Sequence, residues 1–314
     1  MLALDPLTEV LQTMHLESVL LCRSILSPPW GVRLRAEYGA KFHIVTSGQG
    51  WLRVEDLDTP VHLSSGDLVV LPHRVSHTLC DALTSPVTDL EEILSLEPVS
   101  GFKLLKYGGN QESGTTVIIS GGINFHHTPT NPLLAALPSL IHVKGEQGQS
   151  LPWLTTTLQS FDCETATDLP GGQTVLTRLA DILFIQAIRS YIAQLPNHQG
   201  GWLRALRTPG ISNALSVMHR YPEQDWTVSS LAQRASMSRS SFAARFTQLV
   251  GVPPLRYLMN WRMNKAVELL QDKQLTMKEI AVQVGYSSEV VFSQVFKRWS
   301  GYPPGLYRHK HLEF

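Results

Sequence analysis

One pattern of apolar and polar positions occurs twice in the C-terminal third of this 314-residue chain. In each copy a threonine precedes a segment with apolar residues at helical spacing, two phenylalanines follow, and a glycine and two prolines end the unit. The matched positions are Thr227, Leu231, Ala232, Met237, Ser238, Phe242, Phe246, Gly251, Pro253, Pro254 and Tyr257, then Thr276, Ile280, Ala281, Tyr286, Ser287, Phe292, Phe296, Gly301, Pro303, Pro304 and Tyr307. The offset is 49 residues up to the serine pair and 50 from the first phenylalanine pair onward. We therefore predict two units built on one plan, with one residue inserted ahead of the phenylalanines.

Each copy predicts a helix, a tight turn and a second helix. Thr227 and Thr276 are suited to cap a helix N-terminus, and Glu279 lies three residues after Thr276, at capping-box spacing. Ser236 or Gly285 opens the turn before a serine that can cap the second helix, and the closing prolines cannot continue a helix. An ordinary α-hairpin explains a single copy equally well, but two copies in tandem favour a pair of helix-turn-helix motifs.

The stretch between the copies predicts a rigid connection. Within Leu255 to Gln271, the part from Arg262 to Leu270 has good helix formers and no glycine or proline. Two second helices held on such a spacer can enter successive major grooves on one face of a duplex, roughly 34 Å apart.

The first two hundred residues follow a different pattern. Short β-rich runs, separated by turn residues, lie at residues 42–46, 51–54, 61–63, 67–71 and 115–120. Together they predict a small β-barrel, so the expected fold class is α+β. The predicted divisions are a barrel domain at 1–170, a helical segment and linker at 171–200, and an all-α domain of two helix-turn-helix motifs joined by a long helix at 204–314.

Charge is distributed unevenly between the two parts. From Arg204 to the end there are 15 Lys and Arg against 7 Asp and Glu, a net charge of +8, and the residues before Arg204 carry −8. A basic compact domain is typical of proteins that bind phosphate backbones, and a solvated basic surface does not explain the segregation. The chain has no phosphate-binding glycine loop, no nucleophile elbow and no cysteine-rich metal knuckle.

Residues from about 211 to 307 resemble the AraC/XylS family of bacterial transcription regulators. The resemblance is carried by Arg262 to Leu270, Ile280 to Ser287, Phe292 to Lys297 and Gly301 to Pro304. It implies two helix-turn-helix modules that bind double-stranded DNA and read bases with the second helix of each. It also implies a bacterial cytoplasmic protein, associated with the nucleoid when bound to DNA, that contacts RNA polymerase if it is an activator.

The chain departs from the family at a base-reading position. Many members have an arginine two positions after the central apolar residue of the second helix, whereas this chain has Ala244 and Gln294. The candidate base readers of the first module are Arg239, Ser240, Ser241 and Arg245, of which only the arginines can make a bidentate contact with guanine. In the second module Gln294 suits adenine and Glu289 suits cytosine, with Ser288 also available, whereas Lys297 and Arg298 suit phosphates. Amides at the two helix starts can add phosphate contacts. The predicted DNA-contacting set is Thr227, Ser238, Arg239, Ser240, Ser241, Arg245, Arg262, Thr276, Ser287, Ser288, Glu289, Gln294, Lys297 and Arg298.

The N-terminal part is similar to the cupin sensor domains of some AraC-type regulators, over about residues 5 to 195. Gly66 to His77 resembles the second cupin motif, and Gly48 to Gly50 resembles the turn that ends the first. The His-x-His pair of metal-binding cupins is absent from the first motif. His43, His73 and His77 could still form an open three-imidazole site for a divalent metal such as zinc or iron, or they could be hydrogen-bonded structural histidines.

Residues 172–195 predict a helix whose apolar face is too wide for an isolated surface helix. The barrel alone could cover that face, but related regulators dimerise through a helix in this place, so we expect a homodimer. Arg178, Asp181 and Arg189 exclude a membrane span. A linker is expected at 196–201.

Three cysteines and no secretory signal predict a reducing cytoplasm. Buried structural thiols are one interpretation of Cys22, Cys80 and Cys163. The other is redox sensing, because Cys22 lies where some oxidant-sensing relatives have a reactive thiol, and Cys22 with Cys80 is a candidate pair.

These patterns predict a sequence-specific transcription regulator and not an enzyme. A cupin-like domain would sense a small molecule, a metal or an oxidant and control DNA binding or polymerase recruitment through a shift in conformational populations. The alternative from another class is a metal-dependent cupin oxygenase or isomerase. A third is an architectural DNA binder that responds to no ligand.

Overall fold

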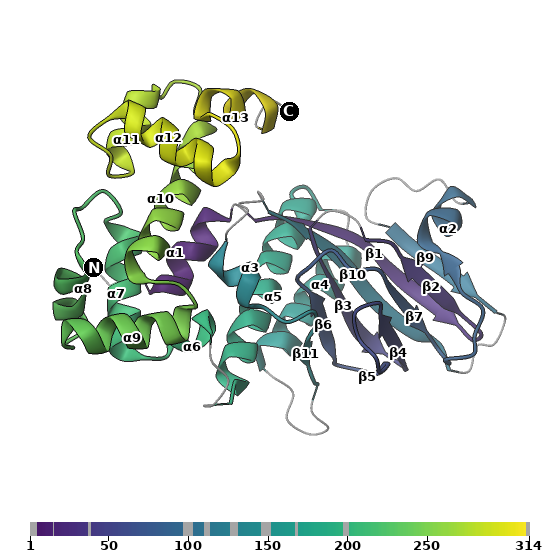
Figure 1. Ribbon diagram of the computed structural model, residues 1–314. Coiled ribbons are helices and arrows are strands. Elements are labelled where there is room, and N and C mark those ends of the chain that lie inside the picture. The colour runs from purple at the N-terminus through teal and green to yellow at the C-terminus, as the bar shows by residue number, and fades with distance from the viewer. Residues whose placement is uncertain are drawn as a thin grey trace. The chain divides into compact units, whose positions relative to one another are not determined.

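The computed structural model describes residues 5–14, 16–36, 39–96, 103–109, 114–125, 131–145, 152–166, 169–196 and 201–311. The chain forms two compact units (Figure 1). One consists of Leu16–Phe125 and Leu137–Gln194, and we call it the sensor unit after the role that the sequence predicts for it. The other consists of Met1–His15, His126–Ala136 and Leu195–Phe314, and we call it the reading unit after its predicted role in reading DNA. Residues 197–200, inside the predicted linker, lie outside the described residues.

The strands of the sensor unit form two sheets, and among the described residues they do not close into the predicted barrel. The six-stranded sheet has the order β11-β6-β3-β10-β1-β9, and the five-stranded sheet has the order β5-β4-β7-β2-β8. The strands are β1 (Glu17–Ser27), β2 (Gly31–Leu34), β3 (Ala40–Ser47), β4 (Gln49–Val54), β5 (Val61–Ser64), β6 (Leu68–Leu71), β7 (His77–Cys80), β8 (Thr88–Asp89), β9 (Lys103–Gly108), β10 (Thr116–Asn124) and β11 (Ile141–Val143). A short helix, α2 (Leu90–Leu96), follows β8.

The core of the sensor unit lies between the two sheets. Leu26, Val69 and Ile118 of the six-stranded sheet join Leu52 and Leu79 of the five-stranded sheet in one buried cluster. Residues that alternate along each strand point to opposite faces, so every second side chain reaches this layer. The sandwich is therefore held mainly by apolar burial.

Two helices, α4 (Pro152–Ala166) and α5 (Gly172–Gln194), complete the sensor unit, and α5 packs against β1, β10, β6 and β11. The buried side of α5 includes Leu176, Leu183 and Ala187. The buried Asp181 accepts a 2.6 Å hydrogen bond from Ser18 on β1, which ties the helix to the sheet. Val175 and Ile182 remain 41% and 45% exposed. The sheet thus covers much of the predicted apolar face but leaves a second, narrower strip open.

The reading unit contains the predicted repeat. Its helices are α6 (Trp202–Leu206), α7 (Pro209–Arg220), α8 (Val228–Arg234), α9 (Arg239–Val250), α10 (Pro254–Leu270), α11 (Met277–Gln283), α12 (Glu289–Ser300) and α13 (Pro304–His311). The long helix α10 joins the two helix-turn-helix motifs as predicted (Figure 1). The phenylalanine pairs are buried, and an edge-on tyrosine closes each core, with ring centroids 5.7 Å apart for Phe246 and Tyr257 and 5.4 Å apart for Phe296 and Tyr307.

Two segments from the N-terminal part of the sequence belong to the reading unit. These are α1 (Pro6–Thr13), drawn in purple beside α7 and α10 in Figure 1, and α3 (Pro132–Ala136), which packs against α6. Val10 of α1 and Met14, which caps the C-terminal end of this helix, are fully buried. The compact units therefore differ from the predicted boundary, which assigned both segments to the barrel domain. Within the described part of the chain, no helix combines the length and the apolar character needed to cross a bilayer.

Candidate nucleic-acid interface

The two turns between the paired helices have the same construction. Ser236 has φ +56° and Gly285 has φ +81°, so each turn passes through the left-handed region, which is costly for a serine. Ser238 then caps α9 by accepting a hydrogen bond from the Ser241 amide. The second cap is Ser288, one residue later than the repeat alignment places it, so Ser287 is exposed and does not cap α12. The inserted residue thus lies in the turn and leaves both helices regular.

The first half of α9 presents a polar surface. Arg239, Ser240 and Ser241 are exposed, whereas Phe242 is buried. Arg245, predicted to contact DNA, donates to the Gln248 side chain at 3.1 Å and is half-buried. Arg239 is therefore the arginine best placed to reach a base edge on this helix.

The corresponding part of α12 exposes both polar and apolar side chains. Glu289, Gln294, Lys297 and Arg298, which are predicted to contact DNA, are exposed. Two large apolar residues that the sequence interpretation missed, Val290 and Val291, are 65% and 48% exposed. They stand at the positions of Ser240 and Ser241 in the 50-residue repeat, so the alignment of the two copies contains the signal that reveals them. Exposed methyl groups on a recognition helix suit the 5-methyl group of thymine.

The N-termini of α8 and α11, the first helices of the two motifs, differ in charge. Thr227 and Thr276 both form capping boxes, with Ser230 and Glu279 respectively. The Thr276 amide donates to the Glu279 carboxylate at 2.8 Å, and this bond lowers the pKa of Glu279. A carboxylate there competes with phosphate, so the start of α8 is the more suitable phosphate contact.

Arg262, also predicted to contact DNA, is used inside the reading unit. Its Nε donates to the Pro222 carbonyl at 2.6 Å, and its Nη2 donates to the Gln224 carbonyl at 2.9 Å. The guanidinium also lies 5.6 Å from the ring centroid of Tyr286. This arginine therefore holds the loop before α8 and the turn after α11 to one helix, and its DNA contact stays a prediction.

Of the three predicted metal ligands, the structure brings together two. His43 Nε2 and His77 Nε2 lie 2.8 Å apart, joining β3 of one sheet to β7 of the other. His73 instead bonds the Leu137 carbonyl at 3.1 Å. The described residues contain no group of three or more side chains able to hold a metal.

The hydrogen-bond partners determine the proton positions on the paired imidazoles. The Val75 carbonyl can only accept, so His77 Nδ1 donates to it at 3.1 Å and His77 Nε2 accepts from His43 Nε2. His43 Nδ1 then accepts from the Ser120 hydroxyl at 2.8 Å. Burial lowers the pKa of His77 to about 4 and holds that of His43 well below its usual value, so both are neutral at neutral pH. Every ring nitrogen is occupied, and these residues do not fit a metal site.

The two candidate redox cysteines form no disulfide, and they lie on different strands and face different sides of their sheets. Cys22 and Leu79 line the same small cavity of about 20 Å³ between the sheets. Cys80 follows Leu79 on β7 and so points to the opposite face of that strand. Burial raises the pKa of the Cys80 thiol, which lowers its reactivity. The structure does not bring Cys22 and Cys80 together as a pair.

Comparison with known proteins shows what this arrangement belongs to. A family described as Cupin matches residues 5–193, and one described as Helix-turn-helix domain matches residues 231–310. The HTH-type transcriptional regulator AlkR of Acinetobacter baylyi is 35% identical over 309 residues, which cover 98% of this chain and 100% of that protein. A protein of Streptomyces lividans named "Putative AraC-like transcription regulator" is 34% identical over 97% of this chain and 98% of its own length. The chain belongs to the AraC-like transcription regulators.

This AraC-like regulator combines a cupin-type N-terminal domain with a double helix-turn-helix domain that binds DNA. The crystallised DNA-binding domain of AdpA, in complex with a target DNA, is 34% identical over 32% of this chain and 90% of that chain, with a TM-score of 0.30. The relatives are named as regulators, which is consistent with a protein that is not an enzyme.

Proposed function

We propose that this regulator reads DNA with the exposed faces of α9 and α12. The observation that carries the proposal is the repetition itself: both motifs have a serine-capped second helix, a buried aromatic core and an exposed first half. Arg239, Ser240 and Ser241 would read bases in the first module, and Glu289, Gln294 and the two valines in the second. Lys297 and Arg298 would contact phosphates, supported by the net charge of +8 from Arg204 onward.

The sensor unit would control DNA binding or polymerase recruitment in response to a small molecule or an oxidant. The neutral, fully bonded imidazole pair disfavours a metal as the signal. The oxidant version would act through Cys22, whose buried thiol lines the small cavity between the sheets. A homodimer would form through α5, whose Val175 and Ile182 are exposed.

The experiment that tests this function selects DNA fragments from the source genome with full-length protein and places each before a reporter. We expect enriched fragments to contain two contacted subsites one helical turn apart, and reporter output to depend on the regulator and on growth conditions. Loss of an oxidant response in Cys22→Ser, but not in Cys163→Ser, would identify the oxidant version. Failure to enrich any fragment would contradict the proposal.

A further inference from the structure

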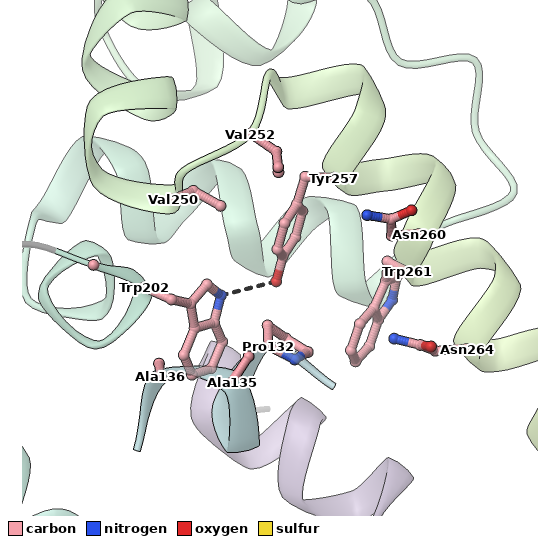
Figure 2. A pocket seen from close by; sticks show the side chains of 11 residues that line it. Pro132, Ala135, Ala136, Trp202, Val250, Val252, Tyr257, Asn260, Trp261 and Asn264 are labelled. Atoms are coloured by element: carbon pink, nitrogen blue, oxygen red, sulfur yellow. Dashed lines mark hydrogen bonds between the residues drawn. The ribbon is translucent and has the colours of Figure 1, made fainter. Parts of the chain in front are cut away.

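We propose that the reading unit has a binding site of its own for a small neutral molecule, in a cavity beside α10 (Figure 2). The cavity has a volume of about 270 Å³, and the eleven described residues that line it belong to the reading unit. The proposed binding site rests on the proposed function in one respect, because a ligand bound there would add a route by which a signal reaches the DNA-reading helices.

One wall of the cavity is a single face of α10. Tyr257, Asn260, Trp261 and Asn264 follow one another at spacings of three, one and three residues, so their side chains share one side of the helix (Figure 2). Trp202 at the start of α6 lies across from them and donates from Nε1 to the Tyr257 hydroxyl at 2.9 Å. The aromatic wall is thus joined to a second helix.

Hydrogen bonding fixes this wall before any ligand arrives. The Tyr257 hydroxyl lies 2.7 Å from Nε2 of the buried His219, whose pKa burial lowers to about 3. His219 is therefore neutral and can accept from the tyrosine, while Trp261 Nε1 donates to the His219 carbonyl at 3.2 Å. A wall with fixed rotamers loses little entropy on binding.

The lining defines the ligand class. Among the lining residues that the structure describes there is no Asp, Glu, Lys or Arg, so these residues offer no charged partner to an ion and favour an uncharged molecule. Two tryptophans, a tyrosine, two valines and a proline provide apolar surface, and the two asparagines provide amide groups. The volume lies near the lower limit of about 300 Å³ for ligand pockets. The occupant would be a small apolar molecule, flat enough to lie against aromatic rings, with one hydrogen-bonding group.

The position of the cavity connects it to DNA reading. Val250 is the last residue of the recognition helix α9, and Val252 lies in the turn that joins α9 to α10. The remaining wall is α3, with Pro132 and Ala136. The chain leading to α3 comes from β10, and the chain leaving it enters β11, so α3 is covalently joined on both sides to the sensor unit. A ligand here would contact α3, α9 and α10 at once and change how firmly they are held together.

The test uses full-length protein and 2-naphthol as a flat, neutral probe, with binding followed by calorimetry at pH 7. We expect saturable binding at one site. Ala136→Leu, which places three more carbon atoms toward the cavity, and Asn260→Leu, which removes an amide, should each weaken binding at least about tenfold. Asn213→Leu, at an exposed position on α7, is the matched control and should bind normally. Naphthalene-2-sulfonate, with the same rings and a charge, should bind at least about tenfold more weakly in the unaltered protein.

DNA affinity is measured in the same samples on a selected genomic fragment. We expect 2-naphthol to change the affinity of the unaltered protein but not that of Ala136→Leu. Absence of saturable binding up to about 1 mM, equal binding of the sulfonate, or full binding by both cavity variants would overturn the site. Unchanged DNA affinity at saturating probe would overturn its role in control. Lack of DNA binding without any probe would contradict the proposed function and leave the cavity result to stand separately.

Discussion

At the scale of residues, α9 and α12 occupy equivalent positions in the repeat but expose side chains of different chemistry. Ser240 and Ser241 of α9 correspond to Val290 and Val291 of α12 in the 50-residue repeat. Hydroxyl groups bond base edges of several kinds, whereas valine methyls favour the methyl group of thymine. The two modules are therefore expected to prefer different sequences, and the operator should be asymmetric within one subunit's footprint.

Arg239 and Arg298 test the division between base reading and phosphate contact. Arg239→Ala should reduce discrimination at one base pair by about 1–3 kcal/mol, because its exposed guanidinium at the start of α9 can bond guanine bidentately. Arg298→Ala should weaken binding to all sequences alike and lower the salt slope by about one. Fluorescence anisotropy on matched and single-mismatch fragments at several salt concentrations measures both. An equal loss of affinity for all fragments in Arg239→Ala would assign this residue to contact with the phosphate backbone of DNA.

The buried imidazole pair predicts how stability depends on pH. The folded state keeps the pKa of His77 at about 4, below its usual 6.5, so between these values the unfolded chain binds protons that the folded chain does not. Stability is then fully present above about pH 6.5 and falls as the pH drops toward 4, by up to about 1.4 kcal/mol per pH unit for each histidine. His43 acts in the same direction.

Urea unfolding from pH 7 to pH 4.5 measures this dependence. His43→Leu/His77→Leu is the comparison, since it removes both titrating groups and retains an apolar layer between the sheets. We expect a shallower pH dependence in the double variant, with the remainder including His219 of the reading unit. Identical slopes in the two proteins would show that the pair is not the cause.

At the scale of elements, two arginines stabilise the repeat in similar ways. Arg262 of α10 bonds the carbonyls of Pro222 and Gln224 ahead of α8. Arg308 of α13 bonds the carbonyls of Leu270, Asp272 and Leu275 ahead of α11. Arg262 also fills the space beside Gly285, where a Cβ would lie 2.6 Å from its Nη2. It therefore links the two modules, while Arg308 stays within the second.

Arg262→Lys tests this link. A lysine cannot make the same pair of bonds while covering the Tyr286 ring, so the two modules should be held less rigidly. We expect the variant to tolerate a one-base-pair change in subsite spacing that the unaltered protein penalises. Arg256→Lys, at an exposed position of the same helix, serves as the control. A loss of DNA affinity that is equal at every spacing would instead indicate that Arg262 contacts DNA directly.

The sequence predicted the helices and strands better than it predicted which of them pack together. The capping threonines, the phenylalanine spacing and the glycine-proline ends located the helices of the reading unit, because each is a local signal. The role of Arg262 depends on carbonyls about forty residues away, which no local pattern records. For the same reason the β-rich runs predicted strands but not their division into two sheets, and nothing in residues 6–13 indicated that this helix packs on α7 and α10.

At the scale of the whole molecule, the net charge of +8 from Arg204 onward belongs to the part that binds DNA, and the residues before it, which carry −8, include the proposed sensing domain. The open strip on α5 supports association of two sensor units, which would place two reading units on one promoter. Val175 and Ile182 lie seven residues apart and so share one helix face.

Ile182→Glu tests the dimer. A charge in this strip should weaken self-association at least about tenfold, because an unpaired carboxylate is costly to bury. Gln194→Glu adds the same charge at an exposed position at the end of α5 and should leave association unchanged. Sedimentation velocity over a concentration series measures both. A variant that associates as strongly as the unaltered protein would place the interface elsewhere.

Hydroxyl-radical footprinting of full-length protein on a selected fragment at low salt tests the central claim most directly. The account predicts that each reading unit protects two patches on one face of the duplex, about one helical turn apart. It also predicts that Glu289→Ala/Gln294→Ala weakens the second patch while the first persists. A single patch, or two patches lost together on changing α12 alone, would contradict reading by two separate recognition helices.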